Sequence, residues 1–264
     1  MNNNIRLIAT DLDRTLLRSD KTISDYTVHV LEQCCARGIK VAFATARKES
    51  AAKRFTDAIL PDAAVFSGGA VVRCGDATVY SCAIPQQTAD HLLRSCLGSS
   101  AVVRIIVETV AGDYLVNFSY DPNSPHWKDY GGGTYSDFSQ GVSCDVYKMI
   151  IECKNEKAAY QISEQHSDVD VIGFAGENWF QLHNKNASKW NGIKHLIAHI
   201  GISAAEVAAF GDDYNDIEML RNSGTGIAVS NALEKAKAAA NFICGSNDED
   251  GVARWIEEHV LGDY

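Results

Sequence analysis

The sequence predicts an α/β fold: a Rossmann-like parallel sheet core with an inserted α+β domain. Three observations lead to this fold class. Apolar runs and helical patterns alternate along the first part of the chain, as they do in parallel βαβ units. This alternation stops near residue 84 and returns near residue 188. Three of the apolar runs end in small or acidic residues.

The first part of the chain has the alternation that parallel strands need. Residues 5–10 form a short apolar run, which indicates a buried strand. Residues 24–38 carry apolar side chains at helical spacing, with Ser24 as a candidate N-cap and Gly38 as a stop. The predicted elements are a strand over 5–10, a helix over 24–38, a strand over 39–44, a helix over 49–60 and a strand over 63–66.

The middle of the chain follows a different pattern, in which helices are followed by probable hairpins. The loop over 121–141 is long for a compact domain, which indicates a segment that is either mobile or functional. The predicted elements are a helix over 85–97, strands over 101–110 and 113–120, a strand over 146–153, a helix over 156–166, and strands over 169–175 and 178–184.

The βα alternation returns in the last part of the chain. The predicted elements are helices over 189–199, 215–222, 231–239 and 251–260, with strands over 207–210 and 226–229. We therefore expect residues 1–83 and 187–264 to form one core and residues 84–186 to form a second domain inserted into it.

Composition argues against several classes of partner. The 264-residue chain has 24 basic and 34 acidic side chains, a net charge of −10. A non-specific nucleic-acid binder or a protein of anionic membranes needs a basic surface, so we expect neither partner. No apolar run approaches the roughly 18 residues of a membrane span. The eight cysteines form no C-x-x-C pair, which is typical of free thiols in a reducing cytosol and predicts a cytoplasmic protein.

Acidic and small polar residues follow three of the predicted core strands. Asp11 and Asp13 follow the first, Thr45 the second, and Asp212 and Asp213 a late one. In an open parallel sheet these carboxyl ends lie along one edge, where ligands bind. Carboxylates gathered there suit Mg²⁺, which prefers oxygen ligands. One aspartate can attack phosphorus while another transfers protons, although each residue taken alone could equally serve a turn or a helix cap.

Four stretches resemble, in order, the motifs of the haloacid dehalogenase superfamily. Residues 11–17 resemble its D-x-D-x-T motif and residues 211–216 its G-D-x-x-N-D motif, while Thr45 and Lys189 resemble the second and third motifs. The C-terminal runs over 226–232 and 246–253 are similar to the Cof-type sugar-phosphatase branch. The resemblance covers the whole chain and implies that the inserted domain is a C2 cap.

The resemblance assigns a role to each matching residue. It implies that Asp11 is the nucleophile and a ligand of Mg²⁺, that Asp13 is the general acid and base and binds the metal through its backbone carbonyl, and that Asp212 is the third ligand. The implied phosphate-binding residues are Leu12, Thr45, Ala46, Lys189 and Asn215. Asp213 and Asp216 are implied to support this site.

Three positions depart from the family pattern. Arg14 stands where the family usually has glycine, Ala46 replaces the glycine after the second-motif threonine, and Gly68 replaces an asparagine after the third strand. A side chain in place of glycine restricts the backbone conformations that a loop can adopt. The family pattern therefore does not predict the geometry of these loops or their contacts with a leaving group. Every residue assigned to the chemistry is present.

The resulting prediction is a Mg²⁺-dependent phosphatase that hydrolyses a small phosphorylated metabolite, with a sugar phosphate as the first candidate, through an aspartyl-phosphate. A phosphotransferase or mutase that uses the same nucleophile, and a non-catalytic sensor of phosphorylated metabolites, are the alternatives. We expect a monomer or a homodimer. Specificity is expected to lie in the inserted domain, whose candidate residues are His126, Trp127, Tyr130, Trp179 and His183.

Overall fold

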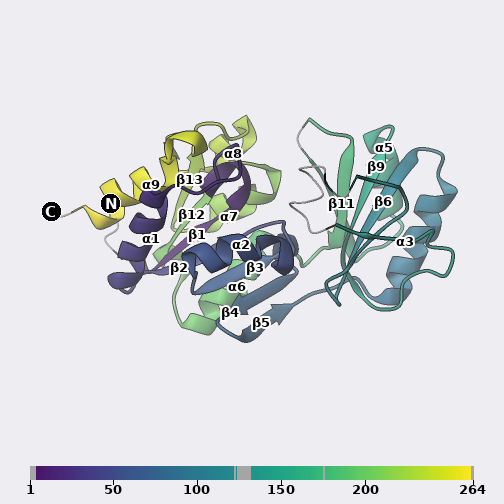
Figure 1. Cartoon of the computed structure of the whole chain (residues 1–264), viewed down its shortest axis with the longest axis horizontal. Coiled ribbons are helices and arrows are strands. Elements are labelled where there is room, and N and C mark those ends of the chain that lie inside the picture. Colours follow the sequence, from purple (N-terminus) through teal and green to yellow (C-terminus); the bar gives the residue numbers. More distant parts are fainter. Residues whose placement is uncertain (1–3, 122, 124–131, 175, 263–264) are drawn as a thin grey trace. The chain divides into compact units, whose positions relative to one another are not determined.

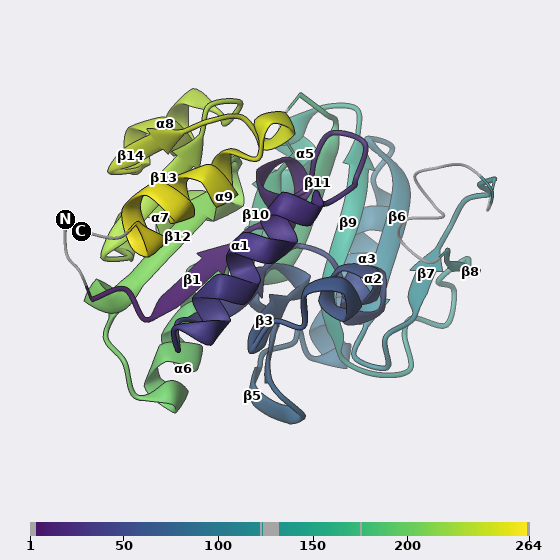
Figure 2. The same cartoon turned by 60° about the vertical axis from the view of Figure 1, so that its left-hand side comes forward.

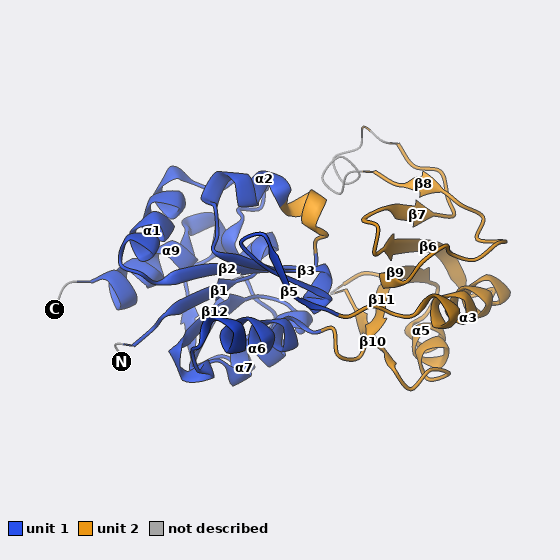
Figure 3. Ribbon diagram, turned by 90° about the horizontal axis from the view of Figure 1, so that it is seen from below, with its two compact units in different colours: residues 1–46, 53–81, 188–264 blue, residues 47–52, 82–187 orange. Residues whose placement is uncertain are grey.

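The computed structural model describes residues 4–121, 123, 132–174 and 176–262. The chain forms two compact units (Figure 3). Unit 1 comprises residues 1–46, 53–81 and 188–264, and unit 2 comprises residues 47–52 and 82–187. The predicted class, an α/β fold with a parallel core sheet and an inserted α+β domain, is confirmed.

Unit 1 is built on an eight-stranded sheet with the order β14-β13-β12-β1-β2-β3-β4-β5. All neighbours from β14 to β3 are parallel, and β4 and β5 are antiparallel additions at one edge. The strands are β1 (Leu7–Thr10), β2 (Lys40–Ala44), β3 (Ala63–Phe66), β4 (Val71–Cys74), β5 (Ala77–Ser81), β12 (Val207–Gly211), β13 (Thr225–Val229) and β14 (Phe242–Cys244). The strand β1 is therefore central, as its fully buried side chains require.

Helices cover both faces of this sheet. On one face α6 (Lys189–Ile200) packs Ile193 and Leu196 against apolar side chains of the central strands, and Figure 3 shows α7 (Ile217–Asn222) on the same side. On the other face α1 (Asp25–Ala36) and α9 (Gly251–Ile256) lie together (Figure 2). The remaining helices of unit 1 are α2 (Glu49–Ile59), whose first residues cluster with unit 2, and α8 (Glu234–Ala239).

Unit 2 contains a six-stranded sheet, of which β11, β9 and β6 are labelled in Figure 1. Its strand order is β10-β11-β9-β6-β7-β8 (Figure 3). Its neighbours are antiparallel except for β7 and β8. Two helices pack on one face and enclose an apolar core that includes Leu92, Met149 and Leu182. The elements are α3 (Gln86–Gly98), β6 (Val102–Thr109), β7 (Tyr114–Val116), β8 (Thr134–Tyr135), β9 (Val146–Cys153), α5 (Glu156–Ser163), β10 (Val169–Gly173) and β11 (Trp179–Asn184).

Four of the described strands, β4, β5, β8 and β14, were not predicted from the sequence. The β4–β5 hairpin turns at Gly75, which has a φ of 52°, and β5 is largely exposed and so lacks an apolar pattern. The strand β14 has only three residues, two of them exposed. Short edge strands depend on pairing with a neighbour more than on their own sequence. Within the described ranges, no helix combines the length and apolar character that crossing a membrane requires.

Candidate active site

The carboxyl ends of β1, β2 and β12 place the predicted site residues along one edge of the sheet. Thr10 is in register with Phe43 of β2 and with Phe210 of β12. Asp11 therefore emerges beside the ends of both neighbouring strands, and Asp212 follows β12 directly. Thr45, one residue beyond β2, is buried, and its N–H donates to the carbonyl of Val65.

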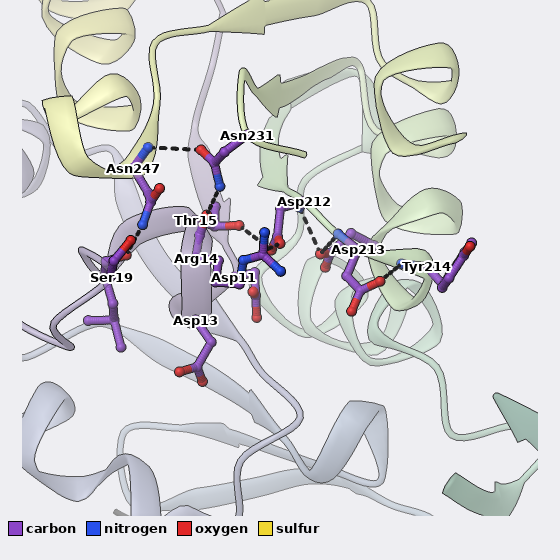
Figure 4. Close-up of polar contacts among 12 residues, drawn as sticks. Asp11, Asp13, Arg14, Thr15, Ser19, Asp212, Asp213, Tyr214, Asn231 and Asn247 are labelled. Carbon is purple, nitrogen blue, oxygen red and sulfur yellow. Dashed lines mark hydrogen bonds and ion pairs between the residues drawn. The ribbon is translucent and has the colours of Figure 1, made fainter. Parts of the chain in front are cut away.

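Asp11 opens a turn over Leu12–Leu16, in which the N–H groups of Leu16 and Leu17 donate to the carbonyls of Asp11 and Leu12, while Asp13 and Arg14 have non-helical backbone conformations. Within this turn Leu12 is fully buried, and the Thr15 hydroxyl donates a hydrogen bond of 2.8 Å to Asp212 Oδ1. This bond joins the loop after β1 to the loop after β12 (Figure 4). Asp13 points out of the turn and is partly exposed, and its Oδ1 lies 2.6 Å from Lys21 Nζ.

Lys189 is a buried cation between two carboxylates. It is the first residue of α6, whose N-cap is Ser188. Its Nζ donates hydrogen bonds of 2.7 Å to Asp11 Oδ1 and of 2.7 Å to Asp216 Oδ1. The side chain of Lys189 is 1% exposed. An ammonium without water needs such partners, so this lysine fixes the positions of Asp11 and Asp216 relative to α6.

Asp216 organises the loop that follows β12. Its Oδ2 accepts hydrogen bonds from the backbone N–H groups of Asp212 (3.0 Å) and Asp213 (3.1 Å). The neighbouring Gly211 is required for this packing, because a Cβ there would lie 2.4 Å from the Cβ of Asp216. Asp213 lies at the start of the following turn and accepts a bond of 2.7 Å from the N–H of Tyr214. Both carboxylates therefore shape the loop that carries Asp212.

Two predicted phosphate-binding residues have polar groups at this edge. Asn215 has a buried Oδ1 that has no hydrogen-bond partner among the residues that the structure describes. A buried polar atom without a partner is uncommon in folded proteins, and it is typical of sites that bind ligands. Ala46 follows Thr45 and is half-buried. The carbonyl of Thr45 accepts a bond from the N–H of Gly68, so the loops after β2 and β3 support each other.

The family is identified by a match that covers nearly the whole chain. The profile of haloacid dehalogenase-like hydrolases matches residues 8–256. The chain belongs to this family. The four stretches that resemble the motifs of the family all fall within the matched range.

Several relatives of this hydrolase have a similar length. The 5-amino-6-(5-phospho-D-ribitylamino)uracil phosphatase YitU of Bacillus subtilis is 29% identical, with 96% of this chain and 97% of that protein covered. The solved structure of the HAD subclass IIB sugar phosphatase BT4131 superposes with a TM-score of 0.84 at 25% identity, covering 96% of this chain and 98% of the other. The solved structure of a haloacid dehalogenase-like hydrolase from Bacteroides thetaiotaomicron has the same fold, with a TM-score of 0.80 at 24% identity, covering 96% of this chain and 99% of the other. The prediction of an enzyme of the phosphatase type is confirmed.

The electrostatics of the hydrolase site are those of crowded carboxylates. Burial raises the pKa of Asp11 well above its ordinary value; Lys189 opposes this shift, while Asp216 and Asp212 add to it. Burial and the charge of Asp216 raise the pKa of Asp212 to about 7. Burial alone would lower the pKa of Lys189, but Asp11 and Asp216 outweigh it and raise the pKa above its ordinary value. The charge of Lys189 therefore does not offset the negative charge of all the buried carboxylates.

These carboxylates fit a divalent cation. Asp11, Asp212 and Asp216 each offer an oxygen within 4.8 Å of the others. Asp216 already uses both oxygens, one on Lys189 and one on backbone N–H groups. Asp11 and Asp212 are then the side chains best placed to bind a metal. Mg²⁺ prefers oxygen ligands, which these carboxylates supply. Its charge would also offset the cost of burying their negative charge.

We predict that Asp212→Asn raises the melting temperature in metal-free buffer at high pH. The pKa of Asp212 is about 7 in the folded protein and 3.8 ordinarily. The contribution of Asp212 to the free energy of unfolding is therefore fully present below pH 3.8 and is lost as pH rises through about 7. It is lost because the folded state must then give up a proton that it binds more tightly than the unfolded state does. An asparagine avoids this loss.

The measurement is thermal unfolding by circular dichroism with EDTA present. We expect the variant to melt at least about 2 °C above the wild type at pH 8 and close to it at pH 4. Asp57→Asn, on the exposed surface of α2, is the matched control. A gain of equal size at both pH values would contradict the prediction.

Several residues near the site were not singled out by the sequence. Thr15 lies in the first motif, and its contact with Asp212 could have been inferred from that position. No signal indicated that Lys21 pairs with Asp13. Asn231 donates a bond of 2.8 Å from Nδ2 to the carbonyl of Arg14, and it accepts one of 3.0 Å from the N–H of Asn247 (Figure 4).

The structure describes two of the five candidate specificity residues of unit 2. His126, Trp127 and Tyr130 lie outside the described residues. Trp179 begins β11 and is half-buried, with its ring 6.5 Å from that of Phe118. His183, on the same strand, has a buried Nδ1 for which the described part of the chain supplies no hydrogen-bond partner.

Proposed function

We propose that this hydrolase is a Mg²⁺-dependent phosphatase that acts on a small phosphorylated metabolite through an aspartyl-phosphate. The observation that carries the proposal is the position of Asp11. Its carboxylate follows the central strand, is held by Lys189 at 2.7 Å, and shares an oxygen cluster with Asp212. A carboxylate fixed in this way can form a bond to phosphorus.

The reaction uses two aspartates in two steps. In the first, an oxygen of Asp11 attacks phosphorus, the bond from phosphorus to the ester oxygen breaks, and Asp13 gives its proton to the leaving oxygen. In the second, Asp13 takes a proton from water, and the resulting hydroxide attacks phosphorus and releases phosphate and Asp11. The side chain of Asp13 is about one quarter exposed, so water can reach it, and it lies 2.6 Å from Lys21 Nζ.

The remaining residues orient the phosphoryl group. Lys189 and the Thr45 hydroxyl are the proposed partners of its oxygens, together with the backbone N–H groups of Leu12 and Ala46. The Oδ1 of Asn215, which has no hydrogen-bond partner among the described residues, is an acceptor and so is available to a donor group of a bound ligand rather than to a phosphoryl oxygen. Asp11, Asp212 and the backbone carbonyl of Asp13 would hold Mg²⁺, which when bound offsets the repulsion between carboxylate and phosphate.

The names of two relatives narrow the substrate class. One is named for a 5-phospho-D-ribitylamino compound and the other as a sugar phosphatase. Both names describe a phosphate carried by a polyhydroxylated carbon chain. We therefore propose a phosphorylated sugar or sugar alcohol as the substrate. A screen of such esters for phosphate release tests this directly, and a chain that releases phosphate from none of them contradicts the proposal.

We predict that EDTA abolishes phosphate release and that Mg²⁺ restores it. Asp11 and Asp212 need a counter-charge before a phosphate dianion can approach them. Ca²⁺ is expected to substitute poorly, since it favours longer bonds and more ligands than an octahedral Mg²⁺ site offers. The assay is hydrolysis of p-nitrophenyl phosphate over a metal titration. Full activity in metal-free buffer would contradict the prediction.

We also predict that unit 2 selects the substrate. Trp179→Ala and His183→Ala are expected to lower kcat/KM for the preferred metabolite by roughly tenfold per lost contact, and to change p-nitrophenyl phosphate hydrolysis little. Contacts remote from phosphorus can stabilise the transition state and so lower kcat when lost. Tyr160→Ala, at an exposed position on α5, is the matched control. An equal loss on both substrates would point to a folding defect.

A further inference from the structure

Arg14 has a backbone conformation that glycine would adopt without cost. Its φ is 61° and its ψ is 7°, in the left-handed region that disfavours side chains. The carbonyl of Arg14 accepts the hydrogen bond from Asn231, so a residue far along the chain holds the loop in this form. The fold therefore maintains a long side chain at a position where a glycine would be relaxed.

The guanidinium of Arg14 lies at the candidate active site. Its Nε is 3.9 Å from Asp212 Oδ2, while Asp212 Oδ1 is taken by the Thr15 hydroxyl (Figure 4). The Arg14 side chain is 59% exposed, whereas that of Asp212 is 6% exposed. Most of the Arg14 donors therefore face solvent beside the residue that we propose as a metal ligand.

Two other cations of this site contact the carboxylates of the proposed chemistry. Lys189 is buried between Asp11 and Asp216, and Lys21 is paired with Asp13 at 2.6 Å. Across the described ranges, the Arg14 guanidinium forms no ion pair besides the long one to Asp212. It can therefore turn toward a ligand and leave the proposed chemistry intact.

We propose that Arg14 binds a second anionic group on the substrate, a carboxylate or a phosphate carried by the part that leaves. The planar guanidinium presents paired N–H donors that match the two oxygens of either group. The proposal rests on the phosphatase function proposed above and narrows its substrate class from phosphorylated polyols to those that carry an additional negative charge.

Three substrates that share one carbon chain test this assignment. Ribitol 5-phosphate has a neutral hydroxymethyl end, ribonate 5-phosphate has a carboxylate there, and ribitol 1,5-bisphosphate has a second phosphate. We expect the wild type to prefer at least one of the charged esters over ribitol 5-phosphate by about tenfold in kcat/KM, after correction for the two phosphates of the bisphosphate. Which charged ester is favoured distinguishes carboxylate from phosphate.

Two variants assign the preference to the guanidinium. Arg14→Gln removes the charge, and Arg14→Gly removes the whole side chain at a position where glycine fits. For both variants we expect kcat/KM for a charged ester to be close to kcat/KM for ribitol 5-phosphate. We expect kcat/KM for ribitol 5-phosphate itself to stay within about threefold of the wild-type value. Arg14→Lys is expected to retain part of the preference, since it keeps the charge without the paired donors.

A binding measurement separates this proposal from the proposed function. Calorimetry of Asp11→Asn with each ester, with and without Arg14→Gln, reports recognition without turnover. Tighter binding of a charged ester that Arg14→Gln abolishes supports the proposal even if the chemistry proves different. A wild type without preference, or variants that weaken all three esters equally, would overturn it and leave Arg14 as a counter-charge for Asp212. Phosphate release from none of the three by the wild type counts against the proposed function.

Discussion

Asp11→Asn is expected to reduce kcat by at least about 10⁴-fold, because the amide cannot form the bond to phosphorus. Asparagine has nearly the same shape, and Lys189 keeps its 2.7 Å contact with Asp216. Burial already disfavours the charged form of Asp11, since it raises the pKa of this residue. We therefore expect the variant to melt at or above the temperature of the wild type.

The measurement pairs single-turnover phosphate release with thermal unfolding. Asp57→Asn, an exposed aspartate on α2, should change neither quantity. Asp11→Ala serves as a second variant that cannot revert by deamidation. If either Asp11 variant retains more than a trace of the wild-type rate, the mechanism through an aspartyl-phosphate is wrong, while the assignment of the fold and the family is unaffected.

Lys189→Met is expected to destabilise the fold by about 3 to 5 kcal/mol in metal-free buffer. The substitution leaves Asp11 and Asp216 buried and close together without their shared cation. The side chain of Asp216 is fully buried, so water cannot replace the lost ammonium. Activity should fall as well, because Lys189 is a proposed ligand of the phosphoryl group.

Urea unfolding at pH 7 measures this effect, and two further variants locate its cause. Lys194→Met lies on the same helix but is exposed, so we expect a change within about 0.5 kcal/mol. The double variant Lys189→Met with Asp216→Asn removes one of the stranded charges and should recover part of the loss. No recovery would mean that the methionine disturbs packing and that the charges contribute little.

Much of this site could be predicted because it follows from the ends of buried strands. The apolar runs before Asp11, Thr45 and Asp212 are continuous, so their strands and the acids after them are visible in the sequence. Parallel neighbours then bring these ends together, as the register of β1 with β2 and β12 shows. Placing Lys189 required the family resemblance, because an isolated lysine at a helix start resembles any surface lysine.

The remaining contacts depend on loop conformations that no local pattern encodes. Lys21 reaches Asp13 from a backbone with a φ of 65°, which its sequence does not favour. Arg14 was noted as a departure from the family, but only the structure shows its guanidinium beside Asp212. The strands β4 and β5 were missed because β4 has only four residues, two of them buried, and the edge strand β5 is largely exposed and so has little apolar periodicity.

The loop after β1 is held by side chains that come much later in the sequence, and this order has a consequence during translation. Asn231 binds the carbonyl of Arg14, and Asn247 binds the carbonyl of Leu17 at 3.0 Å. A ribosome synthesises Asp11 long before these two anchors. Until both anchors have emerged, the loop that bears the proposed nucleophile lacks its fixed geometry, and before β12 emerges β1 lacks that neighbour. The nascent chain is expected to remain inactive until Asn231 and Asn247 have left the exit tunnel, so hydrolysis begins only once both anchors are in place.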